Sequence, residues 1–200
     1  MDLEGFNPLA KIPYDCTTDH IRQAMVDFVS FLGFLNVQMY SRGLARFETM
    51  LMPANFSSLV GEFIVTTIPK YCLTLVKNCY HNGHPDLIPK GLFPRDATQY
   101  SDEGIEVKSS RYPRGWQGHN AEDCWLMVFV FTASRGSDTA KSVSSIKFRF
   151  DMVVGAKLSK DDWLFAGRSA ESRRTITASV TRTGYEKMME NWIYKHKSLR

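Results

Sequence analysis

The run WLMVFVFT at residues 125–132 constrains the fold of this 200-residue chain more than any other segment. Apolar residues stand at successive positions, so both faces of a strand formed here are hydrophobic. A strand that is half exposed alternates apolar and polar residues instead. We therefore expect residues 125–132 to be a central strand of a sheet that is flanked on both faces.

The part of the chain that precedes Gly83 has the pattern of helices. Apolar residues recur at helical spacing through Leu32, after Asp15 or Thr17–Thr18 as candidate N-caps. A second helical stretch covers about residues 44–51. A third begins at about residue 55 and runs towards Gly83, with Pro69 expected to kink or split it.

After Gly83 the pattern changes to short strands and irregular loops. Strands are expected at residues 86–88, 105–109, 125–132, 146–154 and 175–181, with loops at 89–103 and 111–122. A terminal helix is expected over residues 185–195. Helices followed by a sheet indicate one mixed α/β (α+β) domain over residues 1–200, with a helical part at about 15–83, a sheet at about 84–182 and the terminal helix at about 185–195.

The residues with the clearest chemical pattern lie between His84 and Ser110. Pro85-Asp86 is followed, after a long loop, by Glu106-Val107-Lys108. Side chains alternate across a strand, so Glu106 and Lys108 share one face while Val107 points to the other. Asp86 on an adjacent strand can place its carboxylate beside Glu106. Two carboxylates can hold a divalent cation such as Mg²⁺, and a lysine adds positive charge near a phosphate.

Here the sequence resembles the PD-(D/E)xK nuclease superfamily, which includes many type II restriction endonucleases. The match consists of Pro85-Asp86 and Glu106-Val107-Lys108, supported by the apolar residues after the aspartate, the serines after the lysine and the hydrophobic strand that follows. The resemblance covers about residues 55–135 in organisation. It implies a restriction-endonuclease-like core, a central mixed β-sheet flanked by helices.

The resemblance also implies specific roles. Asp86, Glu106, the Val107 carbonyl and a helix residue, Glu62, would hold Mg²⁺, for which Mn²⁺ would substitute, and Lys108 would stabilise charge or orient the attacking water. The implied activity is site-specific hydrolysis of double-stranded DNA by a homodimer inside a prokaryotic cell, in the cytoplasm. The alternatives are a structure-specific repair or recombination nuclease and a DNA-binding protein without enzymatic activity.

The identity of the first metal-binding acid has one rival. Asp96, in Pro94-Arg95-Asp96, also lies upstream of Glu106. It sits in a polar loop, where solvated aspartates are common. Asp86 directly follows a proline and precedes Leu-Ile, as a short strand would. We therefore favour Asp86 over Asp96.

Two segments are candidates for DNA contact. The loop after the strand at 105–109 offers side chains that read bases or bind phosphates: Ser109, Arg111, Arg114, Gln117, His119 and Asn120. A second group lies among serines and threonines: Arg168, Arg173, Arg174 and Arg182. In the segment 134–200, Lys and Arg outnumber Asp and Glu by two to one, whereas the segment 1–133 is net acidic. Each group also has an ordinary explanation, a solvated loop anchored by Trp116 or a basic strand face.

Other classes of site find little support in the sequence. The four cysteines, Cys16, Cys72, Cys79 and Cys124, form no CxxC pair, and we expect them to be buried small apolar residues rather than disulfides or zinc ligands. Cys79, His81 and His84 lack a second ligand cluster. No glycine-rich phosphate loop indicates a nucleotide cofactor, and no apolar run of about 18 residues indicates a membrane span.

Overall fold

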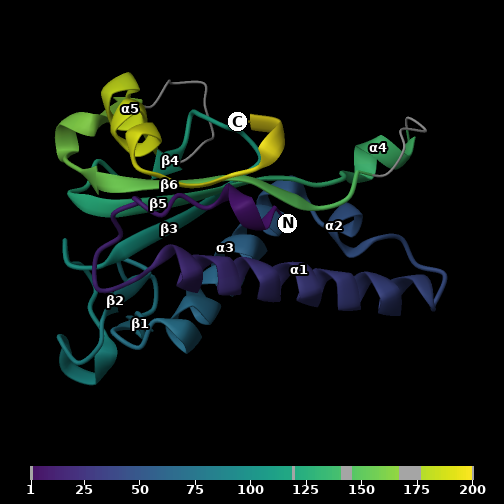
Figure 1. Ribbon diagram of the computed structural model, residues 1–200, viewed down its shortest axis with the longest axis horizontal. Coiled ribbons are helices and arrows are strands. Elements are labelled where there is room, and N and C mark those ends of the chain that lie inside the picture. Colours follow the sequence, from purple (N-terminus) through teal and green to yellow (C-terminus); the bar gives the residue numbers. More distant parts are fainter. Residues whose placement is uncertain (1, 119, 141–145, 167–176, 200) are drawn as a thin grey trace.

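A six-stranded mixed sheet forms the centre of the computed structural model, which describes residues 2–118, 120–140, 146–166 and 177–199 (Figure 1). The strand order is β1-β2-β3-β5-β6-β9. The strands are β1 Leu75–Lys77, β2 Leu87–Pro89, β3 Ile105–Ser110, β5 Cys124–Thr132, β6 Arg149–Leu158 and β9 Trp192–Lys195. The pair β3–β5 is parallel, and the other neighbouring pairs are antiparallel.

The prediction that residues 125–132 form a central strand is confirmed. Strand β5 lies between β3 and β6, and its residues from Cys124 to Phe131 are buried. Alternate side chains serve two cores: Met127 and Phe129 belong to one, Leu126 and Val128 to the other. Because successive side chains point to opposite faces of a strand, an unbroken apolar run is what a sheet covered on both faces requires.

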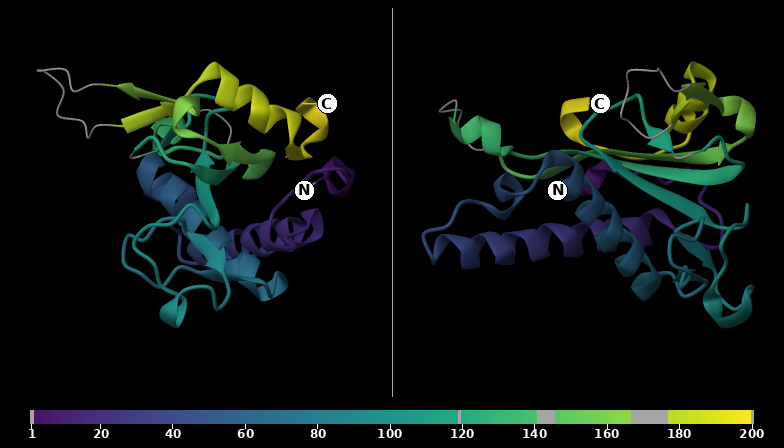
Figure 2. Two further views of the ribbon diagram at one scale, coloured as in Figure 1. Left: turned by 90° about the vertical axis from the view of Figure 1, so that its left-hand side faces the viewer. Right: turned by 180° about the vertical axis from the view of Figure 1, so that it is seen from behind.

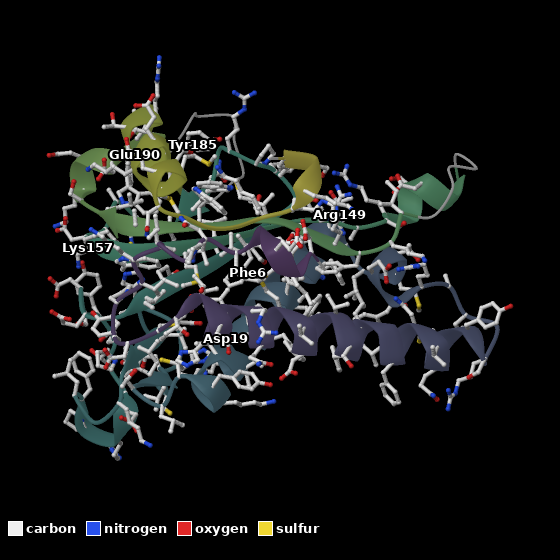
Figure 3. The ribbon with its side chains drawn as sticks, viewed as in Figure 1. Phe6, Asp19, Arg149, Lys157, Tyr185 and Glu190 are labelled. Atoms are coloured by element: carbon white, nitrogen blue, oxygen red, sulfur yellow. The ribbon has the colours of Figure 1, made fainter. Side chains whose placement is uncertain are left out.

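Helices from the N-terminal part cover one face of this sheet (Figures 1 and 2). They are α1 Thr18–Tyr40, the short α2 Phe47–Met50 and α3 Pro53–Tyr71. Of the candidate N-caps Asp15 and Thr17–Thr18, Thr17 caps α1, through a capping box in which the side chain of His20 accepts from the backbone of Thr17. Figure 3 shows side chains filling the layer between α1 and the sheet.

The opposite face is covered by helix α5 and a small second sheet. Helix α5 spans Arg182–Glu190, and the strands are β4 Gln117–Gly118, β7 Trp163–Ala166 and β8 Thr177–Val180, in the order β4-β8-β7. Figure 3 labels Tyr185 and Glu190 on α5, above the sheet. The remaining elements are α4 Gly136–Ala140 and the 3-10 turns Leu3–Gly5, Pro94–Asp96, Lys160–Asp162 and Lys197–Leu199. The expectation of a mixed α+β fold with a central mixed sheet flanked by helices is therefore confirmed.

Two predicted helix boundaries are wrong. The third helix ends at Tyr71, shortly after Pro69, and Leu75–Lys77 is strand β1 rather than a continuation towards Gly83. The terminal helix likewise ends at Glu190, and Trp192–Lys195 is strand β9. In both places the chain finds a free strand edge, of β2 or β6, and backbone hydrogen bonding to that edge replaces helical hydrogen bonds. The sheet therefore extends beyond residues 84–182 at both ends.

The pairing of β2 with β3 positions the two acids of the sequence motif by register alone. Leu87 is opposite Ile105 in this antiparallel pair, so Asp86 and Glu106 stand opposite each other one step further along. The peptide bond between His84 and Pro85 is cis, and it lies directly before this point. None of the helices in the described ranges is long and apolar enough to cross a lipid bilayer.

Candidate active site

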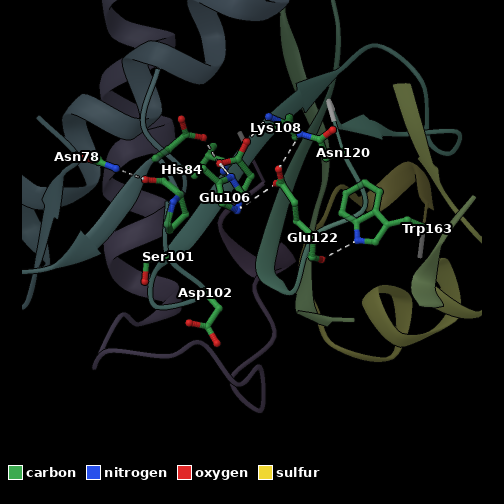
Figure 4. Close-up of polar contacts among 12 residues, drawn as sticks. Asn78, His84, Ser101, Asp102, Glu106, Lys108, Asn120, Glu122 and Trp163 are labelled. Atoms are coloured by element: carbon green, nitrogen blue, oxygen red, sulfur yellow. Dashed lines mark hydrogen bonds and ion pairs between the residues drawn. The ribbon is translucent and has the colours of Figure 1, made fainter. Parts of the chain in front are cut away.

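Asp86, Glu106 and Lys108 meet at the start of β2 and on β3. Asp86 Oδ2 accepts a hydrogen bond of 2.9 Å from the backbone N–H of Val107. Lys108 Nζ donates to Glu106 Oε1, as expected for two residues that share one face of a strand. Figure 4 shows Glu106 and Lys108 pointing toward each other at this site. The sequence prediction that these three side chains converge agrees with this geometry.

The two carboxylates differ strongly in their affinity for protons. Burial and the neighbouring charge of Glu106 raise the pKa of Asp86 to about 7. Burial also opposes ionisation of Glu106, but the hydrogen bond from His84 and the charge of Lys108 outweigh it and lower the pKa of Glu106 to about 2. Lys108 loses solvation on burial, yet Glu106 and Asp86 raise its pKa and keep it protonated. At neutral pH Asp86 is therefore partly protonated, and a bound cation would displace that proton.

His84 and Glu122 complete a partly buried polar cluster that the sequence analysis did not assign. His84 Nδ1 lies 3.1 Å from Glu106 Oε2, and its Nε2 lies 3.2 Å from Glu122 Oε2. The ring also stacks on Tyr100, with centroids 5.6 Å apart. Figure 4 shows His84 and Glu122 beside Glu106. The only available signal was His84 in the same peptide as Asp86; nothing in the spacing pointed to Glu122, which lies well beyond Glu106 in an irregular segment.

These residues form the floor of a cleft of about 1460 Å³. One wall comes from α3, with Ser57, Ser58 and Gly61, and another from the loop around His81. Asn120 and Trp163 line the far side, where Trp163 Nε1 donates to the Glu122 carbonyl. A buried acidic floor under an open polar cleft is an arrangement that suits an extended ligand with oxygen atoms that must approach a bound cation.

The remaining candidate metal ligands lie near this floor. Glu62 lines the cleft from α3, but its carboxylate is exposed and pairs with Lys77 at 2.7 Å. The N–H and C=O groups of one strand residue point towards the same neighbouring strand. The N–H of Val107 donates to Asp86, so the carbonyl of Val107 also points towards the Asp86 side of β3. Asp96 lies at the end of the Pro94–Asp96 turn, where its carboxylate accepts a hydrogen bond from the N–H of Gly91. The geometry therefore favours Asp86 as the acid beside Glu106.

The candidate DNA-contact residues are dispersed. Ser109 donates to the Ser57 carbonyl of α3, and Asn120 lines the cleft. Arg111 points elsewhere: it donates to the Ala133 carbonyl and lies over the Phe56 and Phe131 rings, at 5.4 and 5.2 Å from the centroids. Arg114 and Gln117 are exposed.

The second group of candidates is mostly outside the described residues. Arg182 is the first residue of α5, exposed and paired with Glu186 at 2.8 Å. His119, Arg168, Arg173 and Arg174 lie outside the residues that the structure describes. The surplus of positive charge in the segment 134–200 therefore remains a property of the sequence rather than of a mapped surface.

The donor set fits a hard divalent cation. Asp86 and Glu106 offer carboxylate oxygens and Val107 a carbonyl, which are the ligands that Mg²⁺ and Mn²⁺ take in proteins. Burial and the charge of Glu106 both raise the pKa of Asp86, and a cation beside the two carboxylates would oppose both effects. His84 adds a nitrogen at the edge of the site, which first-row transition metals accept more readily than Mg²⁺ does.

Comparison with known proteins gave no relatives. No family model matches the chain, no curated protein matches it, and no solved structure resembles it closely enough to count as a match.

Asp86→Asn is expected to stabilise the metal-free protein at neutral pH. The folded-state pKa of Asp86, about 7, lies above the value of about 3.9 in an unfolded chain, so the wild type loses stability as pH rises between these values. Asparagine cannot ionise and avoids this loss. The free energy of unfolding of Asp86→Asn minus that of the wild type, measured by denaturant titration in chelator, should be small near pH 4 and grow towards pH 7–8. A difference that shrinks over this range would contradict the assignment.

Proposed function

We propose that this protein is a divalent-metal-dependent endonuclease of the type II restriction kind, which hydrolyses phosphodiester bonds in specific sites of double-stranded DNA. The observation that carries the proposal is the juxtaposition of Asp86 and Glu106 on paired strands with Lys108 on the same face, at the floor of an open cleft. The central mixed sheet flanked by helices supports the restriction-endonuclease-like core that the sequence motif implies.

Asp86, Glu106 and the Val107 carbonyl would hold Mg²⁺, with Mn²⁺ as a substitute, and Glu62 would complete the ligand shell after releasing Lys77. When bound at these residues, the ion would supply an activated water and would stabilise the charge that develops on the phosphate oxygens. His84 would keep the Glu106 carboxylate in place from its second oxygen, 3.1 Å away.

Lys108 would provide a fixed positive charge next to the scissile phosphate. Its neighbours Glu106 and Asp86 keep it protonated in the metal-free protein, so it is suited to neutralise charge on the phosphate and to orient water by donating a hydrogen bond. The cleft walls from α3 and from Asn120 would contact the DNA backbone and bases on either side.

The proposal extends to partners. Cutting both strands of a symmetric site needs two active sites related by a two-fold axis, so the working enzyme would be a homodimer. Light scattering in the presence and absence of DNA tests this. A species of 22.9 kDa in both conditions would count against the dimer.

The decisive experiment is digestion of a defined plasmid with Mg²⁺, followed by sequencing of the new ends. Discrete fragments with a common end sequence would support the restriction activity. Smeared or structure-dependent products would indicate a repair or recombination nuclease instead. DNA binding without cleavage in Mg²⁺ or Mn²⁺ would reject the nuclease and leave a DNA-binding protein.

A further inference from the structure

Cys16, His20 and Cys72 come together at the start of α1, although Cys72 lies far from the other two in sequence. Cys16 precedes the N-cap of α1, His20 lies in its first turn, and Cys72 directly follows α3. One ligand atom from each of the three lies within 4.8 Å of the other two, and both thiols are buried. None of the three lines the acidic cleft, so this cluster is separate from the proposed active site.

The spacing of the three ligand atoms is close to that of a tetrahedral metal centre. Zinc lies about 2.3 Å from thiolate sulfur and about 2.0 Å from imidazole nitrogen, which separates neighbouring ligand atoms by about 3.3–3.8 Å. The ligand atoms lie at most 4.8 Å from one another, so metal binding would shorten the distances between them by about 1–1.5 Å at most. Side-chain rotations can supply a change of that size.

The two residues before Cys16 have an unfavourable left-handed backbone conformation, and the carbonyl oxygen of Tyr14 lies beside Cys72. Tyr14 and Asp15 both have positive φ, 60° and 55°, which non-glycine residues adopt rarely. As a result the Tyr14 carbonyl accepts from Thr74 Oγ1 and lies 3.7 Å from Cys72 Sγ. Strain of this kind is maintained where surrounding contacts require it, and here it adds an oxygen donor to the cluster.

Zinc binds cysteine as the thiolate. Metal binding would therefore release the protons of the Cys16 and Cys72 thiols and leave two thiolates beside the imidazole of His20.

We propose that Cys16, His20 and Cys72 form a binding site for one Zn²⁺ ion that fastens the loop before α1 to the end of α3. Two thiolates and an imidazole select zinc over Mg²⁺, because soft ligands disfavour hard cations. The Tyr14 carbonyl or a water would take the fourth position. The sequence expectation that all four cysteines are buried is wrong for Cys79, which is exposed, and the proposal departs from the expectation that none of them is a zinc ligand. The proposal does not depend on the proposed nuclease activity.

Binding through His20 has an identifiable cost. His20 Nδ1 accepts the Thr17 N–H in the capping box at 3.2 Å, and ligation through that nitrogen would replace this hydrogen bond. A single capping interaction contributes much less free energy than the binding of a structural zinc ion. The cost is therefore small. It also provides a variant, since glutamine at the same position preserves a capping box but is a poor zinc ligand.

The test is a titration of the reduced, chelator-stripped full-length protein with Co²⁺, a spectroscopic substitute for zinc. We expect one sulfur-ligated Co²⁺ per chain, seen as a sulfur-to-cobalt charge-transfer band that saturates at one equivalent, with the strong visible bands of a tetrahedral site and displacement by Zn²⁺. The sulfur band separates this site from the carboxylates of the cleft. Zn²⁺ at a hundredfold excess over its Kd should also raise Tm by about 5–10 °C.

Variants assign the band to residues. Cys16→Ala and Cys72→Ala should each abolish it, and His20→Gln should weaken metal affinity at least about tenfold while circular dichroism stays native. Cys79→Ala removes an exposed cysteine and should change nothing. If Cys16→Ala and Cys72→Ala fail to fold, the comparison of metal affinity between His20→Gln and Cys79→Ala still tests the proposal. The proposal is overturned by a wild type without the sulfur band, by unchanged affinity in His20→Gln, or by a Cys16–Cys72 disulfide whose reduction leaves a protein that binds no metal.

Discussion

Asp86→Asn and Glu106→Gln are each expected to lower the rate of Mg²⁺-dependent DNA cleavage by at least about a thousandfold. Both substitutions keep the shape of the side chain and remove the negative charge that would hold the cation in the proposed mechanism. Without a correctly placed ion, the attacking water is neither activated nor oriented. The measurement is the initial rate of plasmid cleavage under single-turnover conditions, with DNA binding followed separately in Ca²⁺, which binds carboxylates but activates water poorly.

Two further variants make this prediction specific. Lys108→Met should also abolish cleavage while preserving most of the DNA binding, because it removes the charge beside the reacting phosphate and keeps an unbranched chain. Asp96→Asn should cleave like the wild type, since its carboxylate caps the Gly91 N–H in a turn away from Glu106. Full activity in Asp86→Asn, or loss of activity confined to Asp96→Asn, would refute the assigned site.

Activity and stability should separate at Asp86. Burial and the charge of Glu106 make the ionised form of Asp86 unfavourable when no cation is bound, and they therefore raise its pKa. The proposed function needs that ionised form. An inactive Asp86→Asn protein that is more stable than the wild type at neutral pH would fit a functional carboxylate. An inactive and unstable one would indicate a structural carboxylate, since Asp86 also accepts the Val107 N–H.

The parts of the fold that the sequence predicted are those with a local signal. The apolar run of β5 required a central strand, and the candidate N-caps, Asp15 or Thr17–Thr18, placed the start of α1 to within a few residues. Within the motif, the Glu-x-Lys spacing fixed which side chains share a face of β3, because alternation along a strand depends only on sequence. The position of Asp86 beside Glu106 follows from an extended conformation of residues 86–88 on a strand next to β3.

The parts that the sequence did not predict depend on partners distant in the chain. Trp192–Lys195 has apolar residues that fit a helix or a strand, and the open edge of β6 decides between them. Glu122 joins the site only because the crossover from β3 to β5 returns beside His84, which precedes both strands. Cys16 and Cys72 meet only because α1 and α3 pack together. No spacing rule along one chain encodes such encounters.

A single glycine connects the fold to the site. Gly104 has φ of +137°, and a Cβ there would lie 2.2 Å from the Leu87 carbonyl oxygen and 2.5 Å from Pro85 Cγ. The Leu87–Ile105 pairing that places Asp86 opposite Glu106 therefore needs a residue without a side chain at this position. The Tyr14 hydroxyl accepts the Gly104 N–H at 2.7 Å and adds a further restraint.

Gly104→Ala is therefore expected to destabilise the fold by about 2–4 kcal/mol, which lowers Tm by roughly 5–15 °C for a chain of this size, and to abolish cleavage even below the new Tm. Backbone atoms rather than a flexible side chain oppose the new methyl group, so the strands must separate. Gly33→Ala is the matched control: it lies exposed in α1 with nothing within 4 Å of the added Cβ. Alanine there should stabilise the helix by about 0.5–1 kcal/mol and leave cleavage unchanged. Thermal melts and cleavage rates that are alike in the two variants would show that the β2–β3 contact does not position the carboxylates.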